Sequence, residues 1–398
     1  MKILYHHRTL SKDGQNVHIE ELIAAFRRAG HEVMVVGPAA HKEAEFGSDG
    51  GFLSKLRTAL PRGIAEFLEF GYSFLAFSKL WSAYRAFKPD VLYERYNLYM
   101  LAGAWLKAIT GLPFIVEINA PLVLERSREP GLSLKWFARF CERYVWRKAD
   151  WALPVTEVLS RQVQAGGVRS KNIRVMHNGI DLHHFASGHD GAKVRARYGF
   201  ENKIVIGFTG FIREWHGLPA VIEVMKQLRN DHDVAFLVVG EGPGRKGLEQ
   251  AAREHGLAVA VTGVVARADI PDHVAAFNIA LQPKATEYAS PLKVFEYMGL
   301  ARAIIAPAQL NIREILTDHQ DALLFAPDDV ESFSTVLCKL IEDAGLRARI
   351  GAAASATIHA RDFTWDGNAR RITAAIAELT ADKRTVGELR PEPADISP

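Results

Sequence analysis

The feature of this sequence that most restricts its fold is the alternation of short apolar segments with segments of helical periodicity. Residues 17–30 carry apolar side chains at helical spacing and end on Gly30, a residue type common just after a helix. The short segments are rich in aliphatic residues and predict strands: KILYH, HEVMVVG, KPDVLYERY, LPFIVEIN, ADWALPVT and IRVMHNG. This alternation predicts an α/β fold with a parallel, doubly wound sheet.

A second series of the same kind begins after residue 200. Its predicted strands are KIVIGFTG, VAFLVVGEG, VAVTGVV, NIALQPK, RAIIAP and ALLFAP, with LPAVIEVMKQLRN and IPDHVAAFN as helices between them. Because 398 residues exceed one ordinary core, we predict two domains, residues 1–186 and 193–362. The polar segment 186–193 is the predicted linker, and residues 386–398 are a predicted disordered tail. Ligands of such sheets bind beyond the carboxyl ends of the strands.

Composition excludes several classes of protein. With 49 Lys and Arg against 46 Asp and Glu, the formal charge of +3 is too small to indicate a nucleic-acid partner. The two cysteines are far apart, which argues against a disulfide framework and favours the cytoplasm. The sequence holds no His-Glu-x-x-His or Cys-x-x-Cys motif, so we expect neither a metal nor another cofactor. No apolar run is long enough to span a bilayer.

The segment SPLKVFEYMG, residues 290–299, predicts a helix that begins at an anion site. Ser290 is a suitable N-cap and Pro291 a suitable first helical residue. Lys293 then stands in the first turn, where the helix dipole disfavours a cation unless an anion such as a diphosphate lies between them. Glu296 follows on the same face and could accept hydrogen bonds from vicinal hydroxyls. The alternative is an ordinary Lys–Glu pair on the protein surface.

Two further glycine-containing turns follow predicted strands of the second series. FTGFIREWHG, residues 208–217, places Arg213 and His216 in a loop, with Gly210 and Gly217 permitting close approach of the backbone. Arginine is suited to phosphate oxygens, whereas the histidine could equally cap the next helix. VVGEGPGRKGLE, residues 238–249, is a third turn of this kind and contains Glu241.

Taken in their order, HNGIDLHHF, GFIREWHG, VVGEGP and SPLKVFEYMG resemble the motifs of retaining glycosyltransferase family 4, in its Ser-Pro-x-Lys-x-x-Glu variant. The resemblance covers nearly the whole chain. It implies the GT-B fold of two facing Rossmann-like domains, with FTWDGNARRI beginning a crossover helix, about 364–383, that completes the first domain. It also implies that HNGIDLHHF has a structural role in which Asn178 and Gly179 form a tight turn.

The resemblance implies a donor site made largely by the second domain. Glu296 matches the glutamate that holds the ribose, and the loop around Glu241 belongs to the donor side. The remaining donor-binding positions lie at the diphosphate, the base and the transferred sugar: Gly14, Gln15, Arg213, His216, Val265, Leu292 and Lys293. His216 replaces the usual lysine of the diphosphate clamp, which would leave more of that task to Arg213 and Lys293.

The expected catalytic residues are Arg213, Lys293, Asn119 and Glu287. The family often has two glutamates with seven residues between them, whereas Glu287 and Glu296 have eight. Glu287 therefore either reaches the donor sugar or lies on a surface loop.

On the acceptor side, Asn119 stands where many relatives have histidine, and Glu117 lies on the same face of its strand. Either could orient the acceptor; alternatively, Glu117 pairs with Arg126 and Asn119 caps a turn. His18 is predicted to be a first-turn helix residue rather than a catalyst.

We therefore expect a retaining enzyme that moves a sugar from a nucleotide sugar, UDP-linked rather than GDP-linked, to a hydroxyl of a sugar or lipid-linked sugar. The expected setting is bacterial surface polysaccharide synthesis. In the mechanism that the resemblance implies, the leaving diphosphate helps to deprotonate the acceptor. A GT-B-fold sugar-nucleotide epimerase and a non-catalytic sugar-nucleotide-binding scaffold are the alternatives.

Residues 51–87 raise the question of membrane contact. Phe52, Leu53, Leu56 and Leu60 recur at helical spacing with basic residues among them, and few charges lie between residues 70 and 81. A soluble helix normally keeps a polar face. Either the second of these segments is buried between other helices, or the first lies on the inner face of an anionic membrane and brings a lipid-linked acceptor to the enzyme.

Overall fold

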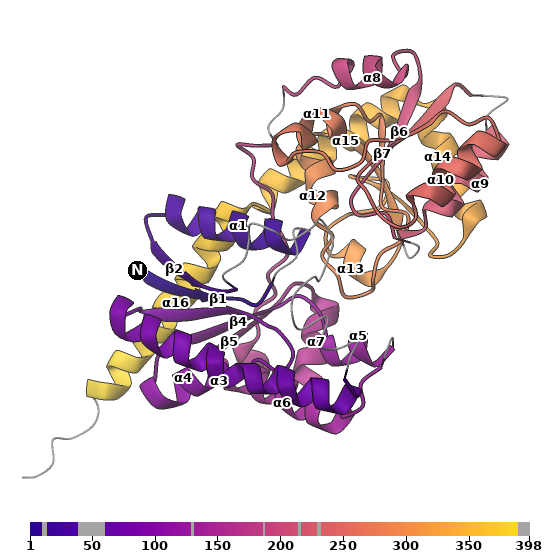
Figure 1. Ribbon diagram of the computed structural model, residues 1–398. Coiled ribbons are helices and arrows are strands. Elements are labelled where there is room, and N and C mark those ends of the chain that lie inside the picture. The colour runs from indigo at the N-terminus through magenta and orange to yellow at the C-terminus, as the bar shows by residue number, and fades with distance from the viewer. Residues whose placement is uncertain are drawn as a thin grey trace, which may run out of the picture.

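Two parallel sheets form the computed structural model, which describes residues 1–9, 14–38, 60–128, 131–185, 188–213, 216–228 and 232–388 (Figure 1). The first sheet has the strand order β2-β1-β3-β4-β5. Its strands are β1 (Lys2–His6), β2 (Glu32–Val36), β3 (Val91–Arg95), β4 (Phe114–Ile118) and β5 (Trp151–Pro154). The helices of this half are α1 (Gly14–Arg28), α3 (Arg62–Phe87), α4 (Ala102–Thr110), α5 (Leu122–Arg128), α6 (Lys135–Lys148) and α7 (Glu157–Ala165), followed by the 3-10 turn η1 (Ser170–Asn172).

The second sheet has the order β11-β10-β9-β6-β7-β8. Its strands are β6 (Ile204–Thr209), β7 (Val234–Val239), β8 (Val259–Val261), β9 (Ile279–Leu281), β10 (Ala303–Pro307) and β11 (Leu323–Phe325). The helical elements are α8 (Ala192–Tyr198), α9 (Leu218–Leu228), α10 (Arg245–Glu254), η3 (Arg267–Asp269), α11 (Ile270–Ala275), α12 (Leu292–Gly299), α13 (Leu310–Arg313), α14 (Val330–Glu342), α15 (Ala344–Ala360) and α16 (Trp365–Glu388). The predicted fold of two Rossmann-like parallel sheets is confirmed.

Alternation along the strands divides the first domain into two apolar layers. Leu4 of β1 packs into the layer that faces α3, α4 and α6, whereas its neighbours Ile3 and Tyr5 pack into the layer that faces α1. Successive strand side chains point to opposite faces, so one short strand contributes to both layers. Strands buried in this way are nearly continuous apolar runs, which is how they were recognised in the sequence.

One predicted strand is absent. Residues 173–179 form no named strand; they make a single isolated bridge, between Ile173 and Ala152 of β5. The backbone N–H groups of Arg174 and Met176 still donate to the carbonyls of Ala152 and Pro154 in β5, and the chain then runs toward the second domain, where Asn178 hydrogen bonds to Ser290. The apolar residues of this segment predicted a strand, but in the structure the segment connects the first domain to the second.

The C-terminal helix α16 returns the chain to the first domain and packs against α1, with Trp365 and Ile372 in the same apolar layer as Ile3 (Figure 1). Thr364 caps α16 by accepting a hydrogen bond from the Gly367 backbone at 2.8 Å. Residues 386–388 of the predicted disordered tail belong to this helix, and residues 389–398 lie outside the described residues.

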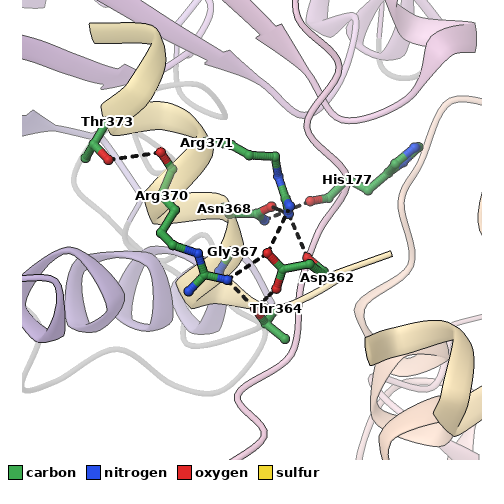
Figure 2. Close-up of polar contacts among 8 residues, drawn as sticks. All are labelled: His177, Asp362, Thr364, Gly367, Asn368, Arg370, Arg371 and Thr373. Atoms are coloured by element: carbon green, nitrogen blue, oxygen red, sulfur yellow. Dashed lines mark hydrogen bonds and ion pairs between the residues drawn. The ribbon is translucent and has the colours of Figure 1, made fainter. Parts of the chain in front are cut away.

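Polar contacts fix the point where α16 begins (Figure 2). Asp362 accepts hydrogen bonds from Arg370 at 2.7 Å and from the Thr364 hydroxyl at 2.8 Å. The Asn368 amide donates to the His177 carbonyl at 2.9 Å, which ties the helix to the strand-like segment that crosses in the other direction. The two connections between the domains are therefore held to each other.

Candidate functional site

A cleft of about 1120 Å³ lies between the carboxyl ends of the two sheets. Its first-domain wall includes the start of α1 and the loop after β4, and its second-domain wall includes the loop after β6 and the start of α12. The two walls approach each other closely, because a Cβ atom on Gly14 would lie 3.4 Å from Leu292 Cδ1. This is the location that the topology of open parallel sheets predicts for a ligand.

Most of the predicted site residues line this cleft, from both domains: Gly14, Gln15, Asn119, Arg213, His216, Val265, Leu292, Lys293 and Glu296. Three do not. Glu117 is buried behind the wall, Glu241 pairs with Arg245 at 2.6 Å, and Glu287 is exposed. The functional roles of all these residues remain predictions.

Lys293 is the most unusual of the cleft residues. Its ammonium lies 3.9 Å from the centre of the Phe208 ring, and among the described residues no carboxylate forms an ion pair with it. Burial lowers the pKa of Lys293 to about 7, although the nearby Glu296 opposes that change. A buried cation is costly unless an anion accompanies it, so this position is prepared for a negatively charged ligand.

The loop after β6 supplies the neighbours of that ammonium. Arg213 stacks on the Phe211 ring at 4.8 Å, and the His216 ring lies 5.4 Å from the Phe208 ring. Burial, together with the charges of Lys293 and Arg213, lowers the pKa of His216 to about 3, so its imidazole is neutral at physiological pH. His216 is therefore a neutral side chain beside the two cations Arg213 and Lys293.

Glycines let two loops of the second domain meet beside the cleft. A Cβ atom on Gly240, whose φ is +151°, would lie 2.0 Å from the carbonyl oxygen of Gly210. Only glycine permits this approach of the loop after β7 to the loop after β6. The glycines predicted to allow close backbone approach therefore position the loop that carries Arg213.

Glu296 takes part in an ion-pair chain that crosses between the domains. Arg267, in η3, donates to Glu296 at 2.8 Å and to Glu21 of α1 at 3.2 Å, and its guanidinium lies over the Phe185 ring at 5.0 Å. Arg267 lines the cleft, but sequence analysis did not select it. Ligands of parallel sheets bind beyond the carboxyl ends of the strands, and η3 follows β8, so the position of Arg267 after that predicted strand could have indicated it.

On the acceptor side, Glu117 is the centre of a buried polar network. Its carboxylate accepts hydrogen bonds from Arg95 at 2.5 Å and Tyr93 at 2.8 Å, contacts His18 Nε2 at 2.9 Å, and bonds to the Asn119 amide. The alternative of a Glu117–Arg126 pair is wrong, since Arg126 pairs with Glu69 of α3.

Burial alone would raise the pKa of the Glu117 carboxyl, but its contacts with His18 and Arg95 hold it below its usual range. Burial lowers the pKa of His18, and this imidazole lines the cleft in the second turn of α1 rather than the first. Glu117 thus holds His18, Arg95 and Asn119 at the cleft wall. His18 and Arg95 were not among the predicted site residues because nothing local in the sequence indicates that they meet.

The segment SPLKVFEYMG differs from the prediction at its start. Pro291 is the N-cap of α12 and Leu292 its first residue; the Ser290 side chain does not cap the helix. Instead, Ser290 Oγ accepts a hydrogen bond from the Asn178 backbone at 3.0 Å, and its carbonyl accepts another from the Asn178 amide at 2.6 Å. A contact between the domains has replaced the local cap, and it links HNGIDLHHF to the donor-side helix.

Two family models match this chain. Residues 13–179 match the glycosyl transferase 4-like domain, and residues 203–343 match the glycosyl transferases group 1 family. The two matches fall on the two halves of the cleft and together cover well over half of the 398 residues. Both halves of the chain therefore match glycosyltransferase domains.

Solved structures share the fold along almost the whole chain. Sucrose-phosphate synthase from Thermosynechococcus elongatus has a TM-score of 0.77 at 16% identity, covering 96% of this chain and 100% of that one. HepE of Anabaena in complex with UDP has a TM-score of 0.73 at 18% identity, covering 95% of this chain and 100% of that one. At such identities the likeness shows the fold alone, and the GT-B prediction is confirmed at that level.

Curated relatives are distant. Alpha-D-kanosaminyltransferase of Streptomyces kanamyceticus is 24% identical over 62% of this chain and 65% of its own length. This chain thus spans less than two thirds of that relative. Phosphatidyl-myo-inositol mannosyltransferase of Mycolicibacterium smegmatis is 25% identical over 88% of this chain and 87% of its own.

Proposed function

We propose that this chain is a retaining glycosyltransferase that moves a sugar from a nucleotide-sugar donor to a hydroxyl group of an acceptor. The observation that carries the proposal is Lys293, a half-buried lysine of the cleft wall whose ammonium has no paired carboxylate among the described residues. The diphosphate of a nucleotide sugar would supply the missing negative charge. Glu296, one turn further along α12, would then bind the ribose hydroxyls.

In the proposed reaction, the bond between the sugar C1 and the diphosphate oxygen breaks while the acceptor oxygen bonds to C1 from the same face. The acceptor proton passes to the departing diphosphate oxygen, so no separate protein base is required. Negative charge grows on the diphosphate as the bond breaks. Arg213, Lys293 and the free N–H groups at the start of α12 would stabilise that charge where it develops.

We further propose UDP as the nucleotide and a sugar or lipid-linked sugar as the acceptor. HepE, which shares the fold, was solved with UDP and with UDP-glucose, and this supports a UDP-linked donor. A lipid acceptor is suggested by the name of the phosphatidyl-myo-inositol mannosyltransferase, and a surface polysaccharide by the lipopolysaccharide outer core galactosyltransferase WaaB, which has a TM-score of 0.64.

A donor screen tests this function directly. The chain would be incubated with several UDP- and GDP-sugars, and release of the nucleotide would be measured with and without sugar and lipid-linked sugar acceptors. Release that depends on an acceptor, with retention of anomeric configuration in the product, is the expected result. Conversion of a nucleotide sugar to an isomer without any acceptor would instead favour the epimerase.

The variant Glu296→Gln is expected to lower kcat/KM for the correct donor by about 10- to 150-fold, which corresponds to about 1.5–3 kcal/mol. The physical reason is that an amide oxygen accepts hydrogen bonds from ribose hydroxyls less strongly than a carboxylate. The matched control is Glu21→Gln, which removes the other carboxylate bound by Arg267 but lies outside the cleft lining. Equal losses in both variants would contradict direct contact of Glu296 with the ribose.

UDP affinity is expected to fall as pH rises from about 7 to 9, by at most about tenfold per pH unit. The diphosphate binds the protonated form of Lys293, whose pKa of about 7 means that the ammonium is lost above this pH. His216, with a pKa of about 3, is neutral throughout, and UDP is fully ionised. Titration calorimetry would measure the effect, and Lys293→Arg should remove it because arginine stays charged. A pH-independent affinity in the native chain would exclude Lys293 from the diphosphate site.

A further inference from the structure

Helix α3 presents an apolar stripe to solvent. Its exposed large apolar side chains are Ile64, Phe67, Leu68, Phe74 and Leu75, and the most exposed, Phe74 and Leu75, retain 61% and 63% of their accessible area. These positions recur at spacings of three, four and seven residues, so they lie on one face of the helix. The alternative that this segment is buried between other helices therefore holds for one face of α3 only.

The face of α3 that points into the domain carries three polar side chains, Glu66, Glu69 and Ser73, beside the apolar Ala65, Ala76 and Leu80. Glu66 accepts hydrogen bonds from the Tyr99 hydroxyl at 2.7 Å and from the Ser133 backbone at 2.7 Å. One turn later, Glu69 pairs with Arg126 at 2.8 Å, and Ser73 donates to the Tyr99 carbonyl at 2.5 Å. Between residues 64 and 75, large apolar side chains thus face outward while two acidic side chains face the interior.

These buried contacts fix the rotation of α3 about its axis. Turning the helix to hide its aromatic residues would expose Glu66, Glu69 and Ser73 and leave their partners unpaired inside the protein, which is costly. The apolar stripe is consequently held outward by the fold. Monomeric soluble proteins rarely present such a continuous apolar surface without a partner.

Helix α6 carries a different kind of surface beside it. Its exposed residues are two aromatic and five basic: Trp136, Phe140, Lys135, Arg139, Arg143, Arg147 and Lys148. The one acidic residue of this fully described helix, Glu142, is buried. Most of these side chains line a shallow hollow of about 640 Å³. The outer face of α6 is therefore strongly positive and aromatic.

The two surfaces are continuous. The rings of Phe67 on α3 and Phe137 on α6 lie 5.3 Å apart, and Phe137 is 5.6 Å from Trp136, which is 69% exposed. Figure 1 shows α3 and α6 running along the same side of the first domain, with α5 at one end. Arg126 of α5 binds Glu69 of α3, and α5 also contributes Leu122, Glu125 and Arg128 to the cleft.

We propose that the outer faces of α3 and α6 form a docking surface for an anionic lipid bilayer. The apolar stripe of α3 enters the boundary between headgroups and acyl chains, and the cations of α6 contact the headgroup phosphates. The five exposed cations of α6, with no exposed acid on that helix, are complementary to a negatively charged surface. They argue against an interface with another protein, because the core of such an interface is normally depleted of charge. None of the helices in the described residues combines the length and apolar character needed to cross a bilayer.

This surface deepens the proposed function, because it would hold the acceptor side of the cleft next to a lipid-linked sugar. It is also a different surface from the one that residues 51–62 suggested, of which residues 51–59 lie outside the described part of the chain. Vesicle binding is measured without donor or acceptor. Its failure would leave the transfer reaction intact, and failure of transfer would leave binding intact.

The experiment is co-sedimentation of the full chain with vesicles of phosphatidylcholine alone or with about one third phosphatidylglycerol. We expect at least about tenfold tighter binding to the anionic vesicles at about 50 mM salt, weakening at about 500 mM as the charges are screened. A chain that stays in solution with anionic vesicles at low salt would overturn the proposal. So would binding that is equally tight to neutral vesicles.

Two double variants test whether α6 and α3 form the docking surface. Arg139→Glu with Arg143→Glu on α6 should abolish the preference for anionic vesicles, and Phe74→Ser with Leu75→Ser on α3 should reduce the binding that remains at high salt. Their controls change exposed residues of the second domain: Lys246→Glu with Arg253→Glu on α10, and Val330→Ser on α14.

All these residues are exposed, so the variants should melt like the native chain, and circular dichroism would check this. The proposal is wrong if the α6 variant binds as the native chain does, or if the controls lose as much binding. It is equally wrong if light scattering finds a dimer in which the α3 stripe is covered by a second copy.

Discussion

Replacing Lys293 by alanine is expected to lower kcat by about 10²- to 10³-fold, the loss seen when one preorganised donor to a developing negative charge is removed. The effect should fall on kcat as well as KM, because the leaving diphosphate is more negative in the transition state than in the bound donor. Its burial and its missing carboxylate partner make Lys293 the residue on which the diphosphate charge would depend most. Steady-state kinetics with the donor found in the screen would measure this.

Although Lys293→Ala should lose activity, we expect it to lose no thermal stability. Because Lys293→Ala removes a half-buried cation with no paired carboxylate among the described residues, the ligand-free protein should melt at the same temperature or higher. UDP should no longer raise that melting temperature. Lys226→Ala on α9, whose lysine pairs with Glu223 at 2.8 Å on the surface, is the control and should change neither quantity. A loss of kcat below about threefold would remove Lys293 from the proposed mechanism.

The second large effect concerns folding. Glu117→Ala is expected to cost about 3–5 kcal/mol of the free energy of unfolding of the first domain, because it leaves Arg95 buried without its carboxylate. In a domain of this size that corresponds to a fall of about 10 °C in the melting temperature. Since folding holds the pKa of Glu117 below its unfolded value, its contribution is present above the unfolded pKa and is lost as pH falls through the folded one.

Glu142 is the matched control for that variant, since it is also a buried carboxyl group of the first domain. Burial raises its pKa to about 7, so its charge contributes little near neutral pH. Glu142→Gln keeps the acceptor for the Tyr96 hydroxyl and should cost less than about 1 kcal/mol. If thermal or denaturant unfolding ranks the two variants in the reverse order, Glu117 is not the centre of the polar network.

The sequence predicted the parts of this protein whose signals are local. All the named strands were visible as apolar runs, because a strand buried on both faces needs apolar side chains throughout, and one further run, 173–179, was wrongly predicted as a strand. The parallel arrangement then brought Arg213 and Lys293 to one cleft without further information, since both lie beyond the strand ends of the same sheet. Gly210 was recognised for the same reason, because it also follows a predicted strand of that sheet.

Other parts of the site depend on partners distant in the chain. Ser290 was a good N-cap by local rules, yet its hydroxyl binds Asn178, which only domain packing places there. Arg267 meets Glu21 across 246 positions of sequence. Glu287 matched a motif by type but lies exposed outside the cleft lining, and its catalytic role stays a prediction. Such contacts leave no periodicity in the sequence by which they could be recognised.

Helix α3 shows most clearly what the sequence determined and what the tertiary structure decided. The sequence by itself determined two parallel sheets, glycine-rich turns at their carboxyl ends, and a helical segment with few charges between residues 70 and 81. Only the tertiary structure decided which side of that helix faces water. Glu66 and Glu69 find hydrogen-bond partners in the interior, on other elements, and satisfying those buried polar groups outweighs hiding Phe74 and Leu75.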